Sequence, residues 1–259
     1  MGPDTAALAE SLREIAHRAG GEILSVYGSD FAVRDKDDAS PVTEADTRAE
    51  RVILEGLARC APGIPVVAEE SFAAGHVPDI DGRPFFLVDP LDGTREFIGR
   101  NGEFTVNIAL VEDGAPTTGV VHLPALGETY WTTGDGTAWR ARGGGAAERI
   151  ACRRPGRRLV AIASRSHRGT ETDAYLRRFE VAETVSAGSS LKFCRIAEGV
   201  ADLYPRLGRT MEWDIAAGHA IVAAAGGRVE TLDGRRLAYG KPGFENPHFV
   251  AHGLPRTPD

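Results

Sequence analysis

The sequence is poor in the features that mark secreted or membrane-spanning proteins. Its 259 residues include only three cysteines, Cys60, Cys152 and Cys194, which are far apart and odd in number. This pattern fits neither a disulfide framework nor a zinc site, so we interpret the thiols as reduced groups of a cytoplasmic protein. No apolar run approaches the roughly 20 residues of a membrane-spanning helix, and the N-terminus lacks the apolar segment of a signal peptide. No stable membrane insertion is expected, and a loose association with the inner membrane stays open.

Positive charge is also scarce. Thirty Lys and Arg residues face 37 Asp and Glu residues, which gives a formal net charge of -7. Nonspecific binding to nucleic acid needs a basic face, so the charge argues against a nucleic-acid partner. A small phosphorylated substrate stays compatible, because it needs only a local cluster of basic groups. With 42% hydrophobic residues, the chain is long enough to bury one large core or two modest ones.

Hydrophobic periodicity predicts two amphipathic helices near the N-terminus, over residues 4–28 and 43–60. Thr43 is placed to cap the second helix, and Asp46 then falls in its first turn, where a carboxylate suits the helix dipole. Short buried strands are predicted at 64–71 and 85–93. Two hairpins are predicted to follow them, and they turn at 113–114 and at 134–136.

The second half of the chain alternates strands with helices, which is typical of an α/β arrangement. A glycine- and arginine-rich run at 140–158 precedes it and is the candidate boundary. We expect an N-terminal α+β subdomain over 1–150, with a largely antiparallel sheet and most of the acidic site residues, and a smaller α/β subdomain over 151–259. The strands are predicted at 158–166, 183–188, 200–205 and 228–232, and the helices at 171–179, 190–199 and 213–227.

Two aspartates bracket a tight bend at the end of the strand predicted at 85–93. Pro90 pushes Asp89 toward an extended conformation, and Gly93 lets the backbone turn tightly. Asp89 and Asp92 are therefore held close, and close carboxylates repel unless a proton or a cation lies between them. Mg²⁺ prefers such oxygen ligands. A solvated turn at a strand end is the alternative that this segment alone leaves open.

Acidic residues in three further segments follow a similar pattern. Glu69 and Glu70 end the strand predicted at 64–71, and Asp46 and Asp214 fall in the first turns of predicted helices. Each position alone is also explained as surface charge or as an acid at a helix N-terminus. Their common order along the chain is the more informative feature.

That order resembles the Mg²⁺-dependent, lithium-sensitive phosphatases of the inositol monophosphatase superfamily. The matching elements are Asp46, Glu69-Glu70, "DPLDGT" (89–94) and "WDIAA" (213–217). The resemblance covers nearly the whole chain. It implies an α/β (α+β) fold, a layered αβαβα sandwich of the inositol monophosphatase and fructose-1,6-bisphosphatase type, with the metal site between two subdomains.

Within this superfamily, the flanking segments are most similar to the 3'(2'),5'-bisphosphate nucleotidases of the CysQ type. Arg95 is a small departure, since lysine is expected after "DPLDGT". The segments are "SPVTEAD" (40–46), "EFTVNIALVEDG" (103–114), "SRSH" (164–167), "AGSSLKFCRIAEGVADLYPR" (187–206) and "MEWDIAAG" (211–218).

The resemblance implies a site that holds two or three Mg²⁺ ions. One ion would be held by Glu69, Asp89 and the carbonyl of Leu91. A second would be held by Asp89, Asp92 and Asp214, so that Asp89 bridges the two ions. A carbonyl oxygen is an acceptable Mg²⁺ ligand beside carboxylates.

The catalytic residues implied by the resemblance are Asp46, Thr94 and Glu69. Asp46 and Thr94 would orient and deprotonate the attacking water. The role of Glu70 is left open, an ordering of Glu69 being one option, and Lys36 is interpreted as a loop cation with an indirect role.

Substrate contacts are expected from donors and from positive charge. The backbone N–H groups of Gly93 and Thr94 lie at a turn that suits a phosphate. The further candidates are His167, Gly188, Ser189, Ser190, Lys192, Arg206 and Asp214. Surface charge and helix capping are the alternative explanations for the lysine, the arginine and the two serines.

The implied activity is hydrolysis of the 3'-phosphate of 3'-phosphoadenosine 5'-phosphate to AMP and phosphate, which serves sulfate assimilation and nucleotide recycling. Two alternatives stay open. One is the same chemistry on an inositol, sugar or histidinol phosphate. The other is a non-catalytic protein that binds a phosphonucleotide, against which the pairing of Thr94 with Asp46 argues. A homodimer is one option for the assembly.

Overall fold

The computed structural model describes residues 5–35, 41–165 and 169–255. The helices over these residues include two long N-terminal ones, which the periodicity predicted, and five shorter ones. They are α1 (Thr5–Tyr27), α2 (Glu44–Cys60), α3 (Glu69–Ala73), α4 (Thr94–Ile98), α5 (Thr170–Leu176), α6 (Leu191–Ala197) and α7 (Glu212–Ala224), with 3-10 turns η1 (Pro124–Leu126) and η2 (Pro242–Phe244). None of the described helices combines the length and the apolar composition that crossing a bilayer requires.

A seven-stranded sheet forms the first half of the molecule. Only β3 and β4 pair in parallel, and all the other neighbours are antiparallel, which confirms the largely antiparallel sheet predicted for this half. Its strands, in spatial order, are β3 (Val66–Ala68), β4 (Phe85–Asp92), β5 (Thr105–Glu112), β6 (Ala115–Leu123), β7 (Glu128–Thr132), β8 (Ala138–Arg142) and β9 (Glu148–Ile150).

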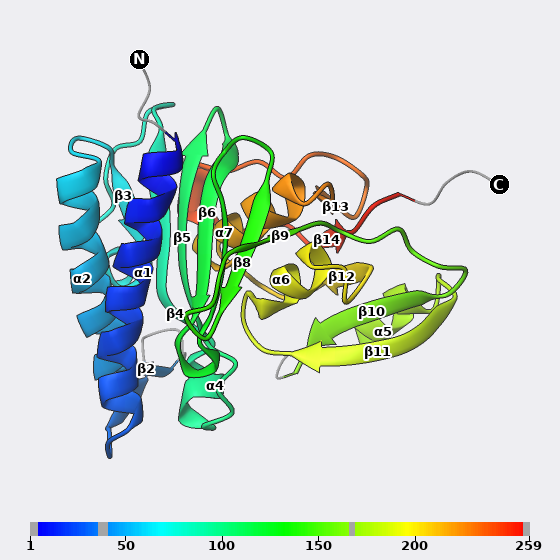
Figure 1. Ribbon diagram of the computed structural model, residues 1–259, viewed down its shortest axis with the longest axis horizontal. Coiled ribbons are helices and arrows are strands. Elements are labelled where there is room, and N and C mark those ends of the chain that lie inside the picture. Colours follow the sequence, from blue (N-terminus) through cyan, green and yellow to red (C-terminus); the bar gives the residue numbers. More distant parts are fainter. Residues whose placement is uncertain (1–4, 36–40, 166–168, 256–259) are drawn as a thin grey trace.

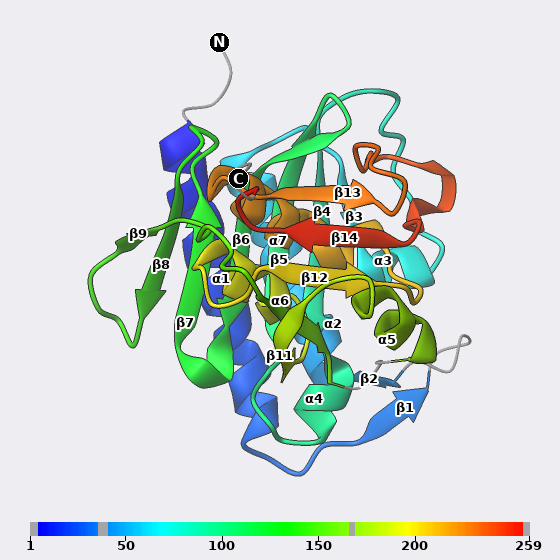
Figure 2. The ribbon, with the colours of Figure 1, turned by 90° about the vertical axis from the view of Figure 1, so that its right-hand side faces the viewer.

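The second half builds a five-stranded mixed sheet, in which β12, β14 and β13 lie side by side (Figure 2). Strand β10 pairs in parallel with both of its neighbours, β11 and β12, whereas β14 runs antiparallel to β12 and β13. Its strands, in spatial order, are β11 (Val181–Ala187), β10 (Leu159–Ser164), β12 (Leu203–Arg206), β14 (Phe249–His252) and β13 (Arg228–Thr231). A separate hairpin joins β1 (Val33–Asp35) to β2 (Pro41–Thr43).

Helices and sheets alternate in the order α, β, α, β, α (Figure 1). Helices α1 and α2 cover one face of the seven-stranded sheet, and α7 packs on β5 and β6 from the other face. Helix α6 lies beside α7 and contacts the five-stranded sheet, and α5 lies on the far side of that sheet. The layered αβαβα sandwich is confirmed.

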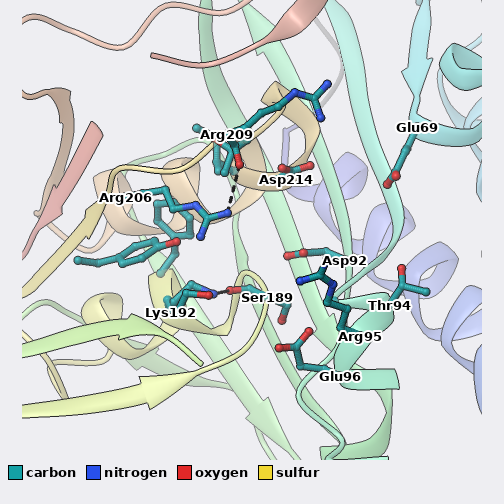
Figure 3. Close-up of a pocket in the computed structure, with 16 residues that line it drawn as sticks. Glu69, Asp92, Thr94, Arg95, Glu96, Ser189, Lys192, Arg206, Arg209 and Asp214 are labelled. Atoms are coloured by element: carbon teal, nitrogen blue, oxygen red, sulfur yellow. Dashed lines mark hydrogen bonds between the residues drawn. The ribbon is translucent and has the colours of Figure 1, made fainter. Parts of the chain in front are cut away.

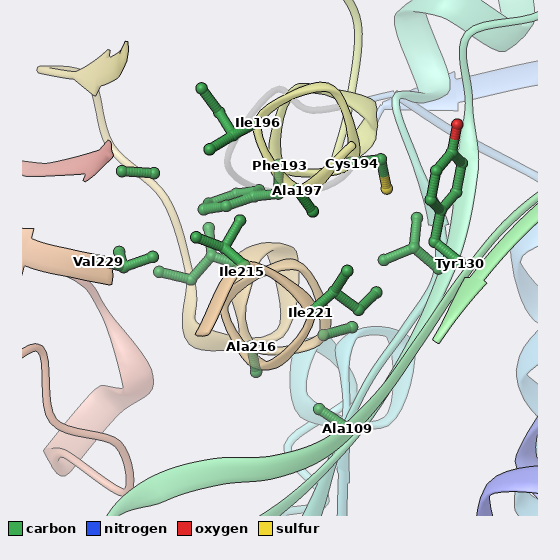
Figure 4. Close-up of a cluster of buried hydrophobic side chains, with 14 of the residues drawn as sticks. Ala109, Tyr130, Phe193, Cys194, Ile196, Ala197, Ile215, Ala216, Ile221 and Val229 are labelled. Atoms are coloured by element: carbon green, nitrogen blue, oxygen red, sulfur yellow. The ribbon is translucent and has the colours of Figure 1, made fainter. Parts of the chain in front are cut away.

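The middle layer holds a core that both halves share (Figure 4). Phe193 and Ile196 of α6 pack with Ile215 and Ile221 of α7, against residues of both sheets. A second core fills the space between α1, α2 and the outer face of the seven-stranded sheet. Because β9 ends at residue 150 and β10 begins at residue 159, we propose that the predicted boundary separates the two sheets and that the subdomains share one core.

The structure corrects three sequence-based expectations. The strand predicted at 64–71 ends at Ala68, and Glu69 begins helix α3, because the backbone N–H groups of Glu70 and Ser71 donate to the carboxylate of Glu50 instead of to a neighbouring strand. Strand β14 was not predicted, since a four-residue apolar run gives little local signal and its partners β12 and β13 are distant in sequence. Strand β9 lies inside the run that was expected to form only a boundary.

Two adjacent glycines of α1, Gly20 and Gly21, provide a matched test of how α1 packs on β6. A Cβ on Gly20 would lie 2.8 Å from the ring of His122, which is itself held by the hydroxyl of Thr129. A Cβ on Gly21 would meet nothing within 4 Å. We expect Gly21→Ala to raise the free energy of unfolding by about 0.5–1 kcal/mol through helix propensity. We expect Gly20→Ala to lower it by about 1–3 kcal/mol through overpacking. Urea denaturation measures both, and equal effects would contradict the packing of α1 on β6.

Candidate active site

A cavity of about 240 Å³ lies between the two sheets, at the ends of helices α3, α4, α6 and α7. Residues from both halves of the chain line it (Figure 3). Arg206 and Lys192 lie on one side, Glu69 and Thr94 on the other, and Asp92 and Asp214 between them. The remaining lining residues are Gly93, Arg95, Glu96, Ser164, Ser189, Phe193, Tyr204, Arg209, Thr210 and Ile215.

The bend after β4 has the geometry that its proline and glycine predict. Asp89 and Asp92 both pair with β5, and the register is interrupted between them. The Asp89 side chain is 2% exposed and accepts a hydrogen bond from Leu91 N at 3.0 Å. Gly93 has a φ of 90°, in the left-handed region that favours glycine. The two acids are therefore held by backbone on either side of the bend.

Asp46 and Thr94 come together as the sequence predicts. Asp46 is 2% exposed in the first turn of α2, where one carboxylate oxygen accepts the backbone N–H of Thr43 at 2.7 Å. Its other oxygen lies 3.5 Å from the hydroxyl of Thr94, the first residue of α4. The same hydroxyl is 3.4 Å from the carbonyl oxygen of Leu91. Thr94 thus has two acceptors for its single hydrogen.

Asp214 is held in the same way as Asp46. It lies in the first turn of α7, and one of its oxygens accepts the backbone N–H of Met211 at 2.8 Å. Burial raises the pKa of Asp214 well above its usual range, and the nearby charges of Asp92 and Glu69 raise it further. Burial also raises the pKa of Asp92 to about 6, although Lys192 acts in the opposite direction. In the protein alone, burial therefore disfavours the charged form of both acids.

The donor set fits a hard divalent cation. Asp92 and Asp214 are half-buried carboxylates that repel each other, and a cation between them would relieve that repulsion. Within the described residues no three His, Cys, Asp or Glu side chains converge as a compact metal cluster. Glu69, Asp92 and Asp214 are instead spread along the cavity wall, whereas Asp89 and Leu91 are buried and do not line it.

Gly188 and Ser190, two of the predicted substrate contacts, have other neighbours in the structure. A Cβ on Gly188 would lie 2.6 Å from Cγ of Glu96, so this glycine is required by packing against α4. The hydroxyl of Ser190 donates to the carbonyl of Asp214 at 2.6 Å and joins α6 to α7. Neither residue lines the cavity. The resemblance implied that Gly188 and Ser190 contact the substrate. In the structure, Gly188 packs against Glu96, and Ser190 binds the carbonyl of Asp214.

Lys192 lines the cavity but is 5% exposed. Its ammonium group donates to the carbonyl oxygens of Ala187 and Ser189, and it lies 5.5 Å from the ring of Tyr204. Burial lowers its pKa to about 8, against the opposing effect of Asp92. Lys192 therefore first holds the loop before α6, and its availability to a phosphate is smaller than predicted.

Ser189 and Arg206 each have a buried polar atom without a hydrogen-bond partner among the described residues. Ser189 has a φ of 42°, and its buried hydroxyl oxygen has no hydrogen-bond partner. Arg206 donates to the carbonyl of Arg209 at 3.1 Å, while its buried Nε has no partner. Two predicted residues, His167 and Lys36, lie outside the described residues.

Some cavity residues were not predicted as site residues. Arg95 and Glu96 follow directly on "DPLDGT", and Arg209 and Thr210 precede "MEWD". Their closeness to the recognised motifs was the available signal. Asn107 on β5 was missed altogether, although its amide contacts Asp92 at 3.4 Å and Ser190 at 3.1 Å.

The sequence and the fold are similar to those of known proteins. The sequence pattern described as the inositol monophosphatase family matches residues 4–254. The chain belongs to the inositol monophosphatase family. The 3'(2'),5'-bisphosphate nucleotidase CysQ of Salmonella typhimurium is 48% identical over 243 residues, which cover 93% of this chain and 97% of that protein. The protein of the same name from Escherichia coli K12 is 46% identical over 239 residues, 91% of this chain and 96% of the relative.

Solved structures agree with the family membership. The crystal structure of CysQ from Bacteroides thetaiotaomicron superposes with a TM-score of 0.81 at 37% identity, covering 97% of this chain and 98% of that one. The extragenic suppressor protein suhB of Bartonella henselae gives a TM-score of 0.73 at 26% identity, with coverages of 95% and 94%. The fold of this family member is thus shared along almost its whole length.

The raised pKa of Asp92 leads to a prediction about the metal-free protein. A carboxyl with a raised folded-state pKa contributes stability below its unfolded pKa, and this contribution is lost as the pH rises through about 6. We expect Asp92→Asn to stabilise the metal-free protein at pH 8 by about 1–3 kcal/mol and to change little at pH 4.5. We also expect the variant to lose most of the stabilisation that Mg²⁺ gives the wild type.

Thermal unfolding with EDTA and with Mg²⁺ measures both effects. The matched control is Glu55→Gln, which removes an exposed charge from α2. Equal stability changes for Asp92→Asn at the two pH values would contradict the crowding of carboxylates in the cavity.

Proposed function

We propose that this protein is a Mg²⁺-dependent 3'(2'),5'-bisphosphate nucleotidase that hydrolyses the 3'-phosphate of 3'-phosphoadenosine 5'-phosphate to AMP and phosphate. The nucleotidases named CysQ, at 46–48% identity over nearly their full lengths, support this activity. The observation that carries the proposal is the cavity itself. It places the hydroxyl of Thr94, 3.5 Å from Asp46, beside the acids Asp92 and Asp214.

Two Mg²⁺ ions, with a third as an option, fit the proposed acid set. Glu69, Asp89 and the Leu91 carbonyl would hold one ion. Asp89, Asp92 and Asp214 would hold the other. When bound, Mg²⁺ neutralises the charge of the phosphate and lowers the pKa of a bound water molecule.

In the proposed reaction, Thr94 and Asp46 accept the proton of the attacking water in turn. Asp46 has one oxygen fixed by Thr43, which leaves the other to accept the hydroxyl hydrogen of Thr94. The oxygen of Thr94 then accepts a hydrogen from the attacking water. As the water oxygen bonds to phosphorus, its proton passes to Thr94 while the proton of Thr94 passes to Asp46. The P–O3' bond breaks, and the ribose oxygen takes a proton from solvent. AMP and inorganic phosphate leave.

The 5'-phosphate is expected at the basic side of the cavity. Arg206 lies across the cavity from Glu69 and Thr94 (Figure 3) and retains a buried, unpartnered Nε. A guanidinium group suits a phosphate because it offers several donors in a fixed plane. Ser189 contributes a hydroxyl without a partner at the same wall. We also propose a cytoplasmic location, a role in sulfate assimilation and a homodimer.

Phosphate release from a small panel of substrates tests the function. We expect 3'-phosphoadenosine 5'-phosphate to exceed inositol 1-phosphate and histidinol phosphate in kcat/KM, and EDTA to abolish the activity. A preference for inositol 1-phosphate would support the sugar-phosphatase alternative. No turnover on any compound with Mg²⁺ present would support the non-catalytic binding protein.

Replacing the bridging acid should separate catalysis from folding. We expect Asp89→Asn to lower turnover by roughly 10²-fold or more, comparable with the loss of one strong electrostatic stabiliser. Folding should survive, because the side-chain oxygen that accepts Leu91 N is retained. Asp233→Asn, at an exposed turn after β13, is the control and should keep wild-type turnover. Near-normal turnover of Asp89→Asn at limiting Mg²⁺ would contradict the proposed set of Mg²⁺ ligands.

Arg206 should distinguish substrates by their 5'-phosphate. A charge-assisted contact of this kind is worth roughly 1.5–3 kcal/mol, or about 10- to 150-fold in kcat/KM. We expect Arg206→Ala to lose about that much on 3'-phosphoadenosine 5'-phosphate. We expect it to act almost normally on 3'-AMP and inositol 1-phosphate, which lack a 5'-phosphate. Kinetics of both enzymes on the three compounds measure the difference, with Arg178→Ala as a control away from the cavity. A uniform loss would remove Arg206 from the binding role.

A further inference from the structure

Helix α2 carries a second buried acid that the proposed chemistry does not use. Glu50 follows Asp46 by four residues, which places both side chains on one face of the helix, about one turn apart. Glu50 is 5% exposed. A buried carboxylate is costly unless hydrogen bonds compensate it, so its partners indicate why it is there.

All the partners that Glu50 accepts from belong to the start of α3. Its Oε2 accepts the backbone N–H of Glu70 at 2.8 Å, and its Oε1 accepts the backbone N–H of Ser71 at 2.9 Å and the Ser71 hydroxyl at 2.6 Å. Helix α3 is five residues long, and Ala68 at its N-cap offers no side-chain hydrogen bond. Glu50 therefore caps this helix from outside, in the place that a Ser, Thr or Asp would usually fill.

This contact fixes the residue that faces the cavity. Glu69 is the first residue of α3 and lines the cavity, and Glu70 and Ser71 are the next two residues of the chain. The direction of the Glu69 side chain follows the backbone of this short turn. Because Glu50 and Asp46 share one face of α2, the same helix sets the position of Asp46 and of Glu69.

We propose that Glu50 is a positioning residue that holds Glu69 in place to bind Mg²⁺, by capping α3 from α2. The proposal rests on the proposed function, since it takes Glu69 as a metal ligand. Both oxygens of Glu50 are acceptors in use, and a glutamine would present one amide group to N–H donors instead. Glu50→Gln therefore breaks at least one of the three contacts while it keeps the size of the side chain.

The matched control is Asp202, another buried acid, which lies away from the cavity. It is also 5% exposed, accepts the backbone N–H of Val160 at 2.7 Å, and pairs with Arg153 at 2.8 Å. Asp202→Asn thus removes a buried charge and weakens backbone contacts without touching α3. A general loss of stability should affect both variants, whereas a loss of metal positioning should affect only Glu50→Gln.

The experiment measures metal binding directly. Free Mn²⁺ is followed by electron paramagnetic resonance during titration of the full chain, and Mg²⁺-induced thermal stabilisation is measured beside it. We expect the half-saturating metal concentration of Glu50→Gln to rise about 10- to 100-fold, the usual effect of removing an outer partner of a metal ligand. Ser71→Ala, which removes only the hydroxyl contact, should give a smaller rise in the same direction. Asp202→Asn should lower the melting temperature and leave the metal titration unchanged. With saturating Mg²⁺, the KM of Glu50→Gln for 3'-phosphoadenosine 5'-phosphate should stay within about threefold of the wild type.

An unchanged metal titration for Glu50→Gln, with a lowered melting temperature, would overturn the proposal and leave Glu50 a purely structural residue. If Glu50→Gln does not fold, Ser71→Ala decides by the same comparison: a raised metal concentration supports the proposal and an unchanged one overturns it. Failure of the proposed function has a different signature. The wild type would then bind the metal ions but release no phosphate from the nucleotide, and the positioning role of Glu50 would still stand on the titration.

Discussion

Repulsion between carboxylates is the constraint on which the site depends. Burial raises the pKa of both Asp92 and Asp214, and the charge of Asp92 raises the pKa of Asp214 further, so the fold must hold together groups that favour moving apart. It does so with backbone N–H groups. Asp46 and Asp214 each occupy the third position of a helix and each bind the N–H three residues before, at 2.7 Å and 2.8 Å. One oxygen of each carboxylate is thereby fixed by the helix start, which sets the direction of the side chain.

The shared core supplies the rigidity that this arrangement needs. Helix α7, which carries Asp214, is apolar on nearly every side and lies between the two sheets (Figure 4). Its place relative to β4 and Asp92 is therefore set by packing on both faces. Helix α6 is tied to the seven-stranded sheet by ion pairs as well. The carboxylate of Glu198, at the C-terminal end of α6, contacts Arg140 at 2.5 Å and Arg142 at 3.2 Å, both on β8. These ion pairs join α6 to the seven-stranded sheet. The two halves of the chain that line the cavity are therefore also connected at a place away from the cavity.

Local chemistry made part of the site predictable. A helix cap at Thr43 and a bend at Pro90 and Gly93 are decided by a few neighbouring residues, and the structure has both. Side-chain direction is decided by distant neighbours, and there the sequence was a poorer guide. Gly188 and Lys192 match the nucleotidases by residue type, yet the first is required by Glu96 and the second binds loop carbonyls. Glu50 was missed because an acid four residues after another on a helix looks like a solvated face until its partners on α3 are known. Strand β14 was missed for the same reason, because its pairing with β12 and β13 is not local.

We propose that the distribution of charge in the cavity favours a substrate with two phosphates over one with a single phosphate. Asp92, Asp214 and Glu69 can hold a phosphate only through cations, whereas Arg206 can bind one directly. A single phosphate at the cations would leave the buried Nε of Arg206 without a partner, as it is in the protein alone. A buried donor without a partner costs about 1–3 kcal/mol, and a second anionic group recovers that loss on binding. On this proposal, selectivity for a bisphosphate over a monophosphate would follow from the unpartnered Nε of Arg206, and the acids Glu69, Asp92 and Asp214 would serve either substrate in the same reaction.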